Sequence, residues 1–298
     1  MTEAKNPNRP LVSVIIPNYN YGHFISTSIE SVLNQTYKNI ELIFVDDGSS
    51  DNSVDIAKKY QSSIILIQQE NAGVSTARNH GLVYAKGDFI CFLDSDDSWE
   101  PEKVALQISK FQNKEIGVVY SSINICDEDL TFKETLSAFH RGDCSNLYFK
   151  YPTRAIVLLG CSSAMIRKNV TTQVGKFDIS LNTSADWDYF RRIANVTRVD
   201  FVDKPLVNYR RHSASMSVGS LEKYYQDNEL AVLKLLSDAT EGNRSPRLRW
   251  RSRLAWIKFQ LGATIALLKG RRFSESIRHV KKLVAFQPLA SRKASQNA

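Results

Sequence analysis

The sequence predicts an α/β protein with a mostly parallel central sheet flanked by helices, followed by a C-terminal α-helical extension. Two observations lead to this prediction. Over the first 121 residues, short apolar runs alternate with segments whose apolar residues recur at helical spacing, as in parallel strands joined by crossover helices. The apolar runs are continuous, which is typical of strands buried on both faces of a sheet.

The predicted elements follow one another in a regular order. Strands are expected at residues 11–17, 40–45, 64–67, 88–93 and 117–121, and helices at 23–35, 51–60, 74–85 and 101–111. Residues 122–150 have a polar, loop-like pattern. Further on, strands are expected at 162–166, 196–202 and 206–209, and a helix at 186–194. After residue 221 the whole sequence is predicted to be helical.

Composition excludes several classes of protein. Hydrophobic residues make up 43% of the 298 residues and charged residues 23%, which is ordinary for a globular protein and argues against disorder. The four cysteines form no CxxC pair, so we expect neither a disulfide framework nor a zinc site, and a reducing cytoplasm is the default location. The first ten residues lack the apolar core of a signal peptide. The longest apolar stretch, 254–268, is too short to span a membrane and contains Lys258.

Charge is distributed unevenly along the chain. The net charge is +8, but residues 241–298 alone hold 14 Lys and Arg against two acidic residues. This asymmetry predicts an acidic body with a basic C-terminal appendage.

Three carboxylates directly follow the predicted strand at residues 88–93. Asp94, Asp96 and Asp97 lie within four positions, where like charges repel unless a cation lies among them. Asn18 and the Asp46-Asp47 pair follow two other predicted strands. Because the carboxyl ends of parallel strands meet at one edge of a sheet, we expect these polar ends to form a single ligand site. The alternative is a set of solvated turns.

Missing motifs narrow the chemistry of this site. The sequence has no GxxxxGK[ST] loop, no GxGxxG after the first strand, and neither HExxH nor GxSxG. Clustered carboxylates without neighbouring His or Cys favour a hard cation such as Mg²⁺ or Mn²⁺. Since Mg²⁺ commonly binds one or two carboxylates together with substrate phosphates, a nucleoside diphosphate is the expected ligand.

Five sequence blocks resemble the family 2 glycosyltransferases. They are VSVIIPNYN at 12–20, VDDGSSDNS at 45–53, NAGVSTARNHGL at 71–82, GDFICFLDSDD at 87–97 and ADWDYFRRI at 185–193. The resemblance covers about residues 10–215 and implies the GT-A fold and an inverting, metal-dependent enzyme that uses nucleotide sugars. It implies a catalytic domain at 1–220, with nucleotide-sugar binding at about 10–122 and acceptor binding at about 123–220, before a basic helical region at 221–298.

The resemblance also assigns residues to the nucleotide-sugar donor and the metal. The donor site is implied to contain Pro17, Tyr19, Asp47, Arg78, Asp94, Asp96 and His212. Asp47 would accept a hydrogen bond from the base, with Tyr19 nearby. Asp94 and Asp96 form the DxD motif of the family, and Asp97 directly follows it. Asp96 and Asp97 are the implied ligands of Mn²⁺ or Mg²⁺.

Asp186 matches the catalytic base of the family. The family base is usually the aspartate of a Glu-Asp pair, whereas Ala185 stands before it here. An inverting enzyme needs one carboxylate that deprotonates the acceptor hydroxyl. The structural alternative for Asp186 is a carboxylate that complements a helix N-terminus. His212 and Arg78 have the alternative of simple surface positions.

We therefore expect a transferase that moves sugar from a nucleotide sugar, specifically a UDP-sugar, to a glycan or lipid-linked acceptor in bacterial surface polysaccharide synthesis. The alternatives are a non-catalytic nucleotide- or glycan-binding protein on the same fold, and a sugar-nucleotide pyrophosphorylase. The latter is disfavoured because the glycine-rich basic loop that it needs is replaced by residues 18–22.

The basic C-terminal region permits two interpretations. Residues 246–288 are predicted to form a helical hairpin turning near residues 269–270, which packs on the catalytic domain. Alternatively, Arg and Lys beside Trp250 and Trp256 suit peripheral contact with the anionic inner face of the cell membrane. No module for nucleic-acid binding is present.

Overall fold

The computed structural model describes residues 9–150, 160–215, 221–240 and 246–269, and these fall into two compact units. The first unit contains the described residues up to 145 and from 160 to 215. The second contains residues 146–150 and the helices after residue 220.

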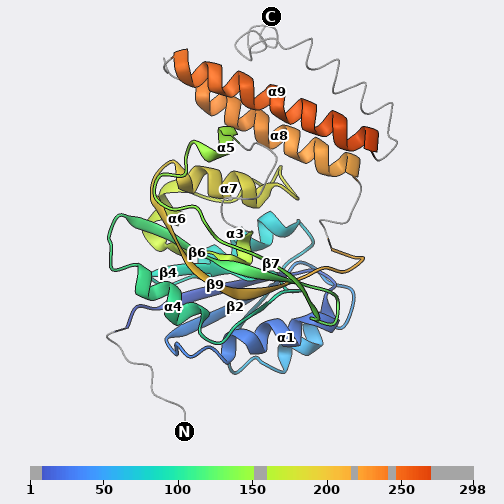
Figure 1. Cartoon of the computed structure of the whole chain (residues 1–298). Helices are drawn as coiled ribbons and strands as arrows, with labels where there is room; N and C mark the ends of the chain where they lie inside the picture. The colour runs from blue at the N-terminus through green and yellow to red at the C-terminus, as the bar shows by residue number, and fades with distance from the viewer. Residues whose placement is uncertain (1–8, 151–159, 216–220, 241–245, 270–298) are drawn as a thin grey trace, which may run out of the picture. The chain divides into compact units, whose positions relative to one another are not determined.

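A mixed nine-stranded sheet forms the centre of the first unit (Figure 1). Its strands are β1 (Val12–Asn18), β2 (Ile40–Asp46), β3 (Ile65–Gln68), β4 (Phe89–Phe92), β5 (Ser98–Trp99), β6 (Ile116–Cys126), β7 (Phe132–Leu136), β8 (Met165–Arg167) and β9 (Arg198–Arg210). The strand order is β3-β2-β1-β4-β8-β6-β9-β5, and β7 pairs with β6. The predicted α/β class is confirmed.

Helices cover both faces of the sheet (Figure 1). They are α1 (Gly22–Leu33), α2 (Ser53–Lys58), α3 (Val74–Tyr84), α4 (Lys103–Lys110), α6 (Lys168–Val174) and α7 (Ala185–Ala194). Val14 and Ile16 of β1 share a core with Ile25 and Ile29 of α1. On the opposite face, Gly81 of α3 lies so close to Ile15 that an added Cβ would be 2.4 Å from its Cγ2. Burial on both faces explains the continuous apolar runs.

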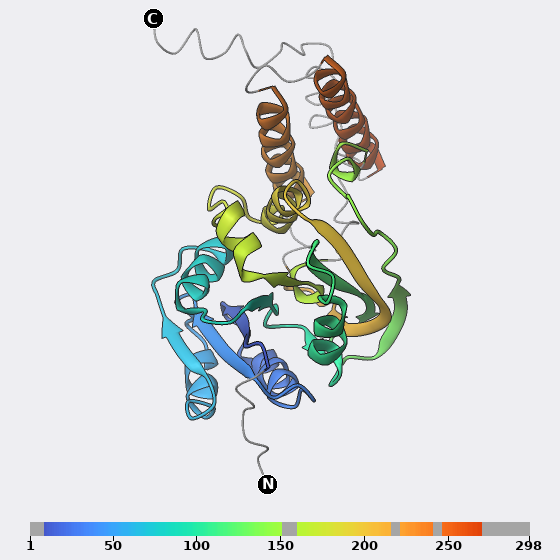
Figure 2. The same ribbon diagram turned by 90° about the vertical axis from the view of Figure 1, so that its left-hand side faces the viewer.

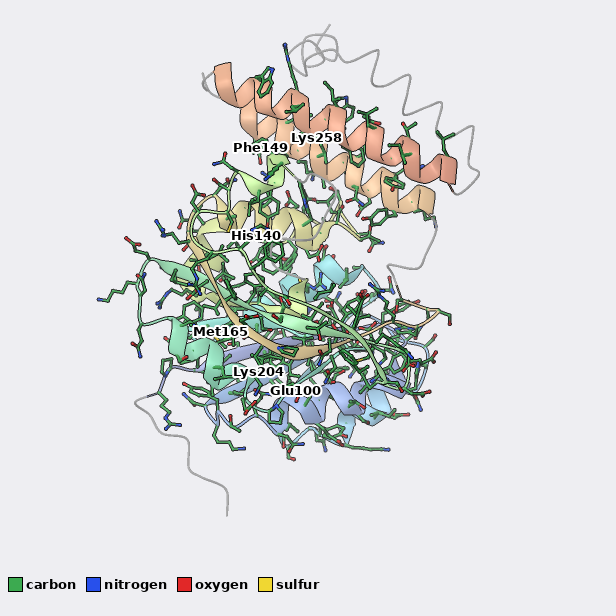
Figure 3. All side chains as sticks on the ribbon, viewed as in Figure 1. Glu100, His140, Phe149, Met165, Lys204 and Lys258 are labelled. Atoms are coloured by element: carbon green, nitrogen blue, oxygen red, sulfur yellow. The ribbon has the colours of Figure 1, made fainter. Side chains whose placement is uncertain are left out.

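The parallel part of the sheet agrees with the prediction, whereas the antiparallel direction of β8 was not predicted. Strands β3, β2, β1 and β4 are parallel neighbours, but β8 inserts antiparallel between β4 and β6. Met165 of this inserted strand, labelled in Figure 3, is fully buried. A strand was expected at 162–166 and β8 overlaps it, but the sequence of so short a strand does not show in which direction it pairs.

The two strands predicted at 196–202 and 206–209 are one strand, β9, drawn as a long yellow-orange arrow in Figure 2. Its pairing with β6 shifts register near Pro205, which has no N–H to donate to the ladder. The polar run after residue 122 was also misread as loop, because β6 continues to Cys126 and pairs with the exposed strand β7.

The second unit contains α5 (Leu147–Lys150), α8 (Leu221–Thr240) and α9 (Pro246–Lys269). Helices α8 and α9 pack through a buried apolar face whose members include Ala231, Val232, Leu235, Ala255, Phe259 and Ala263. Trp256, expected at a membrane surface, is 5% exposed and packs beside Phe259, so that expectation is wrong for Trp256. The second arm of the predicted hairpin lies outside the described residues. No helix in the described ranges is long and apolar enough to cross a bilayer.

Candidate functional site

The polar ends of β1, β2 and β4 meet at one edge of the sheet, as predicted. Asn18 pairs in register with Asp46, and the Nδ2 of Asn18 donates to the Oδ1 of Asp46 at 3.0 Å. Asp46 also accepts from the backbone N–H and hydroxyl of Ser49, at 2.9 and 2.6 Å. Asp46 is 2% exposed and closes the turn after β2. It therefore has a structural role.

Asp47 is held by the loop that leads into α3. Its Oδ1 accepts from the Nε2 of Gln69 at 2.7 Å and from the N–H of Ala72 at 2.9 Å, and its Oδ2 accepts from the N–H of Gly73 at 2.8 Å. Gln69 is fixed in turn by His80, whose Nδ1 lies 2.8 Å from its Oε1. Together these bonds fix the direction of the Asp47 carboxylate.

Gly48 permits this arrangement. Its φ of +74° lies in the left-handed region, and an added Cβ would lie 2.7 Å from the backbone N of Asn71. A glycine is therefore required for the loop of β2 to approach the loop before α3.

The three carboxylates after β4 divide into two kinds. Asp97 is 1% exposed and points into the protein, where its Oδ2 accepts from the hydroxyl of Ser162 at 2.6 Å and its Oδ1 from the N–H of Arg210 at 3.0 Å. The side chains of Asp94 and Asp96 are 31% and 15% exposed. Only these two carboxylates face outward.

Asp94 and Asp96 each have one cationic or ring partner. The Nη2 of Arg78, which extends from α3, donates to the Oδ1 of Asp94 at 2.6 Å. The Nε2 of His212 lies 3.0 Å from the Oδ2 of Asp96. Burial raises the pKa of Asp96, and repulsion from Asp94 raises it further, while the hydrogen bond to His212 opposes both effects. The turn therefore concentrates negative charge that a cation can neutralise.

Arg78 and His212 are not the surface residues of the alternative interpretation. Arg78 is 6% exposed, lies over the ring of Phe177, and has a buried Nε without a hydrogen-bond partner among the described residues. His212 is 7% exposed and packs against the rings of Tyr21 and Phe24. Both positions are held by packing and are directed at the acidic turn.

Asp186 lies in the first turn of α7 and is half-buried. Burial raises the pKa of its carboxyl group, the charge of Arg78 lowers it, and the charge of Asp94 raises it. Since Asp186 interacts electrostatically with both Arg78 and Asp94, it lies near the turn after β4. Its Oδ1 also accepts from the N–H of Trp187 at 2.6 Å, as the helix-terminus alternative requires.

Asp188, two residues further on, has a different environment. Its two oxygens accept from Arg191 at 2.7 Å and from Arg192 at 2.9 Å, and the residue is 2% exposed. The two aspartates of α7 therefore differ in role. Asp188 stabilises the helix through its ion pairs with Arg191 and Arg192, whereas Asp186 is only half-buried.

At the end of β1, Pro17 is buried within the sheet, and Tyr19 is 48% exposed beside the loop of β2. Neither residue contacts the acidic turn through any described hydrogen bond. An exposed ring at this strand end is free to contact a flat ligand.

Several residues that build the site were not recognised in the sequence. Ser162 supports both Asp97 and, as an acceptor, the N–H of Asp94. Arg210 donates from its Nε to the backbone carbonyl of Asp96. The hydroxyl of Tyr21 donates to the carbonyl of Ala214, next to His212. These partners lie 60 to nearly 200 residues away in sequence, so no local pattern indicates them.

The residues present fit a divalent cation bound together with a ligand. Among the described residues, no group of three or more His, Cys, Asp or Glu side chains surrounds one metal position. Mg²⁺ and Mn²⁺ in nucleotide sites need only one or two carboxylates, because phosphates and water complete the coordination. Asp94 and Asp96, with the nearby imidazole of His212, offer such a partial set.

Comparison with known proteins gives consistent results. Residues 13–173 match the family model described as Glycosyl transferase family 2. An uncharacterized glycosyltransferase of Rickettsia typhi is 33% identical over 227 residues, which cover 74% of this chain and 71% of that protein. The UDP-Glc:alpha-D-GlcNAc-diphosphoundecaprenol beta-1,3-glucosyltransferase WfgD of Escherichia coli is 46% identical over 121 residues, 40% of this chain and 48% of WfgD.

Solved structures share the fold. S. aureus TarS 1–349 in complex with UDP-GlcNAc aligns with a TM-score of 0.64 at 17% identity, covering 91% of each chain. This likeness identifies the first unit as a GT-A fold.

Replacing Asp97 with alanine is expected to lower the free energy of unfolding by about 2–4 kcal/mol, because Ser162 and the N–H of Arg210 lose a buried acceptor. The matched variant Asp96→Asn should leave stability unchanged or raise it, since it relieves repulsion from Asp94. Urea denaturation followed by circular dichroism measures both. Equal midpoints for Asp97→Ala and the wild type would contradict the structural role of Asp97.

Proposed function

Because this chain belongs to glycosyl transferase family 2, we propose that it transfers a sugar from a nucleoside-diphosphate sugar to a glycan or lipid-linked acceptor, with inversion at the anomeric carbon. The setting is the synthesis of a bacterial surface polysaccharide. The observation that carries this proposal is that outward carboxylates and a buried arginine meet at the carboxyl ends of parallel strands, and that Asp186 interacts electrostatically with Arg78 and Asp94 there.

The donor is a UDP-sugar in this proposal. WfgD is named as an enzyme that uses UDP-Glc, and TarS was solved with UDP-GlcNAc. Asp47 is 3% exposed and accepts three hydrogen bonds from the protein, and in this proposal a lone pair left on its Oδ2 accepts a further hydrogen bond from the base. Tyr19 contacts the face of the base, and Pro17 lies at the floor of the base site. Arg78 approaches the diphosphate.

Asp94, Asp96 and His212 hold a divalent ion, Mn²⁺ or Mg²⁺, in this proposal. Asp96 was an expected ligand. Asp97, the other expected ligand, points inward to Ser162 and the backbone of Arg210, away from Asp94 and Asp96, so we assign it to the support of the turn. When bound with the donor, the ion acts as a Lewis acid that stabilises charge on the leaving diphosphate. Asp94 additionally fixes Arg78 beside that diphosphate.

Asp186 acts as the base. Its carboxylate takes the proton from the acceptor hydroxyl as that oxygen attacks the anomeric carbon from the face opposite the diphosphate. The bond between the anomeric carbon and the diphosphate oxygen breaks in the same displacement, so the configuration inverts. Burial raises the pKa of Asp186, and the positive charge of Arg78 opposes this rise and so favours the ionised form that a base needs.

We place the reaction in the cytoplasm. All four cysteines, Cys91, Cys126, Cys144 and Cys161, are free and buried, as suits a reducing compartment. In the alternative, a non-catalytic nucleotide-binding protein, Asp186 serves only as a carboxylate at the N-terminus of α7, so sugar transfer that depends on Asp186 distinguishes the two functions.

A panel of nucleotide sugars, scored for transfer and for donor hydrolysis with Mn²⁺ or Mg²⁺, tests the proposed activity.

Asp186→Asn should lower kcat by at least about 100-fold, because the base is lost, while the affinity for the UDP-sugar stays within about threefold of wild type. In the wild type, kcat should fall as pH drops through the raised pKa of Asp186. Transfer by Asp186→Asn at the wild-type rate would assign the base to another residue.

The bonds from His80 to Gln69 and from Gln69 to Asp47 predict a second effect. Gln69→Ala should weaken UDP binding about three- to tenfold with little change in kcat, because it removes one of the three hydrogen bonds that orient the Asp47 carboxylate. His80→Ala should act in the same direction, and His80→Asn should restore affinity by presenting a donor to the Oε1 of Gln69. Calorimetry with UDP measures this, and wild-type affinity in Gln69→Ala would remove Gln69 from base recognition.

A further inference from the structure

Helix α9 carries a row of exposed apolar side chains. Trp250, Ile257, Leu261, Ile265 and Leu268 are 63%, 42%, 47%, 54% and 44% exposed. With about 100° of rotation per residue, these five positions fall within a band of about 80° around the helix. We call this row the α9 stripe.

The opposite face of α9 is already occupied. Ala255, Phe259 and Ala263 are fully buried, and the Phe259 ring lies 6.4 Å from that of Tyr225 on α8. The Nε2 of Gln260 also donates to the Oε1 of Glu229 on α8 at 3.1 Å. Rotation of α9 would break this packing, so the helix cannot bury the α9 stripe against α8.

Basic residues border the α9 stripe. Arg253 and Lys258 are exposed and project from opposite sides of the band, and Lys258 is labelled in Figure 3. Residues 246–269 contain six Lys and Arg and no acidic residue. An apolar centre between cationic edges matches the acyl-chain boundary and headgroups of an anionic lipid surface.

The positive charge beside the α9 stripe disfavours two other binding partners for it. A second copy of α9 would bring the same cationic edges together. The chain beyond residue 269 has seven Lys and Arg and one acidic residue, so it also repels these edges. An anionic bilayer provides both apolar contact and opposite charge.

We propose that the α9 stripe lies in the interface of an anionic membrane, with Trp250 inserted and Arg253 and Lys258 at the headgroups. The sequence alone predicted membrane contact through both Trp250 and Trp256. The α9 stripe includes Trp250 and leaves out Trp256, which is buried. It holds the protein where a lipid-linked acceptor would be found. The inference does not depend on glycosyl transfer, since lipid binding is measured without nucleotide or acceptor.

Sedimentation of the full chain with vesicles tests the proposal. The protein should bind vesicles of mixed phosphatidylglycerol and phosphatidylcholine, bind pure phosphatidylcholine weakly, and dissociate as salt rises. The double variant L261S/I265S should lower the partition coefficient at least about tenfold. R253Q/K258Q should lower it about fivefold per charge removed. The control Val83→Ser, at a 68% exposed position on α3, should bind as wild type does.

Two further measurements distinguish loss of membrane binding from loss of folding. Circular dichroism should show the same helix content in all variants, and the fluorescence of Trp250 should shift to the blue with anionic vesicles but not in Trp250→Phe. No binding by the wild type would overturn the proposal, as would binding by L261S/I265S equal to the wild type. A wild-type dimer that L261S/I265S converts to monomer would instead assign the α9 stripe to a second copy.

Discussion

The acidic turn after β4 sets the constraint on which the rest of the site depends. Three carboxylates in four residues cannot all face one direction without strong repulsion. The fold separates them, with Asp97 directed inward to Ser162 and Arg210, and Asp94 and Asp96 directed outward. The 3₁₀ turn at Cys161–Ser163 and the end of β9 both meet this turn. Distant parts of the chain are thus organised around the placement of one carboxylate.

Helix α3 connects the two ends of the proposed donor site. The loop at its N-terminus holds Asp47 through two backbone N–H groups, and Arg78, one turn further on, reaches Asp94. Gly81 lets the same helix approach β1 closely. A single rigid element therefore sets the distance between the residue proposed to recognise the base and the residue proposed to contact the diphosphate.

The sequence predicts the parts of this site that are local. Strands β1, β2 and β4 are continuous apolar runs, and the polar residues after them meet because parallel strands end at one edge. The inward direction of Asp97 was not predictable, since its partners Ser162 and Arg210 come from remote segments. Likewise, helical periodicity identifies α9 but does not tell which of its two apolar faces packs on α8, so Trp256 was misplaced.

The central claim is that the outward carboxylates tolerate one another because a divalent ion and a diphosphate come to lie between them. Calorimetric titration of UDP into the full chain, with Mn²⁺ and with a chelator, tests this claim most directly. The account predicts that UDP binds at least about tenfold more tightly with Mn²⁺, and that Asp96→Asn removes this difference. Equal UDP affinity with and without the metal, or no UDP binding at all, would contradict it.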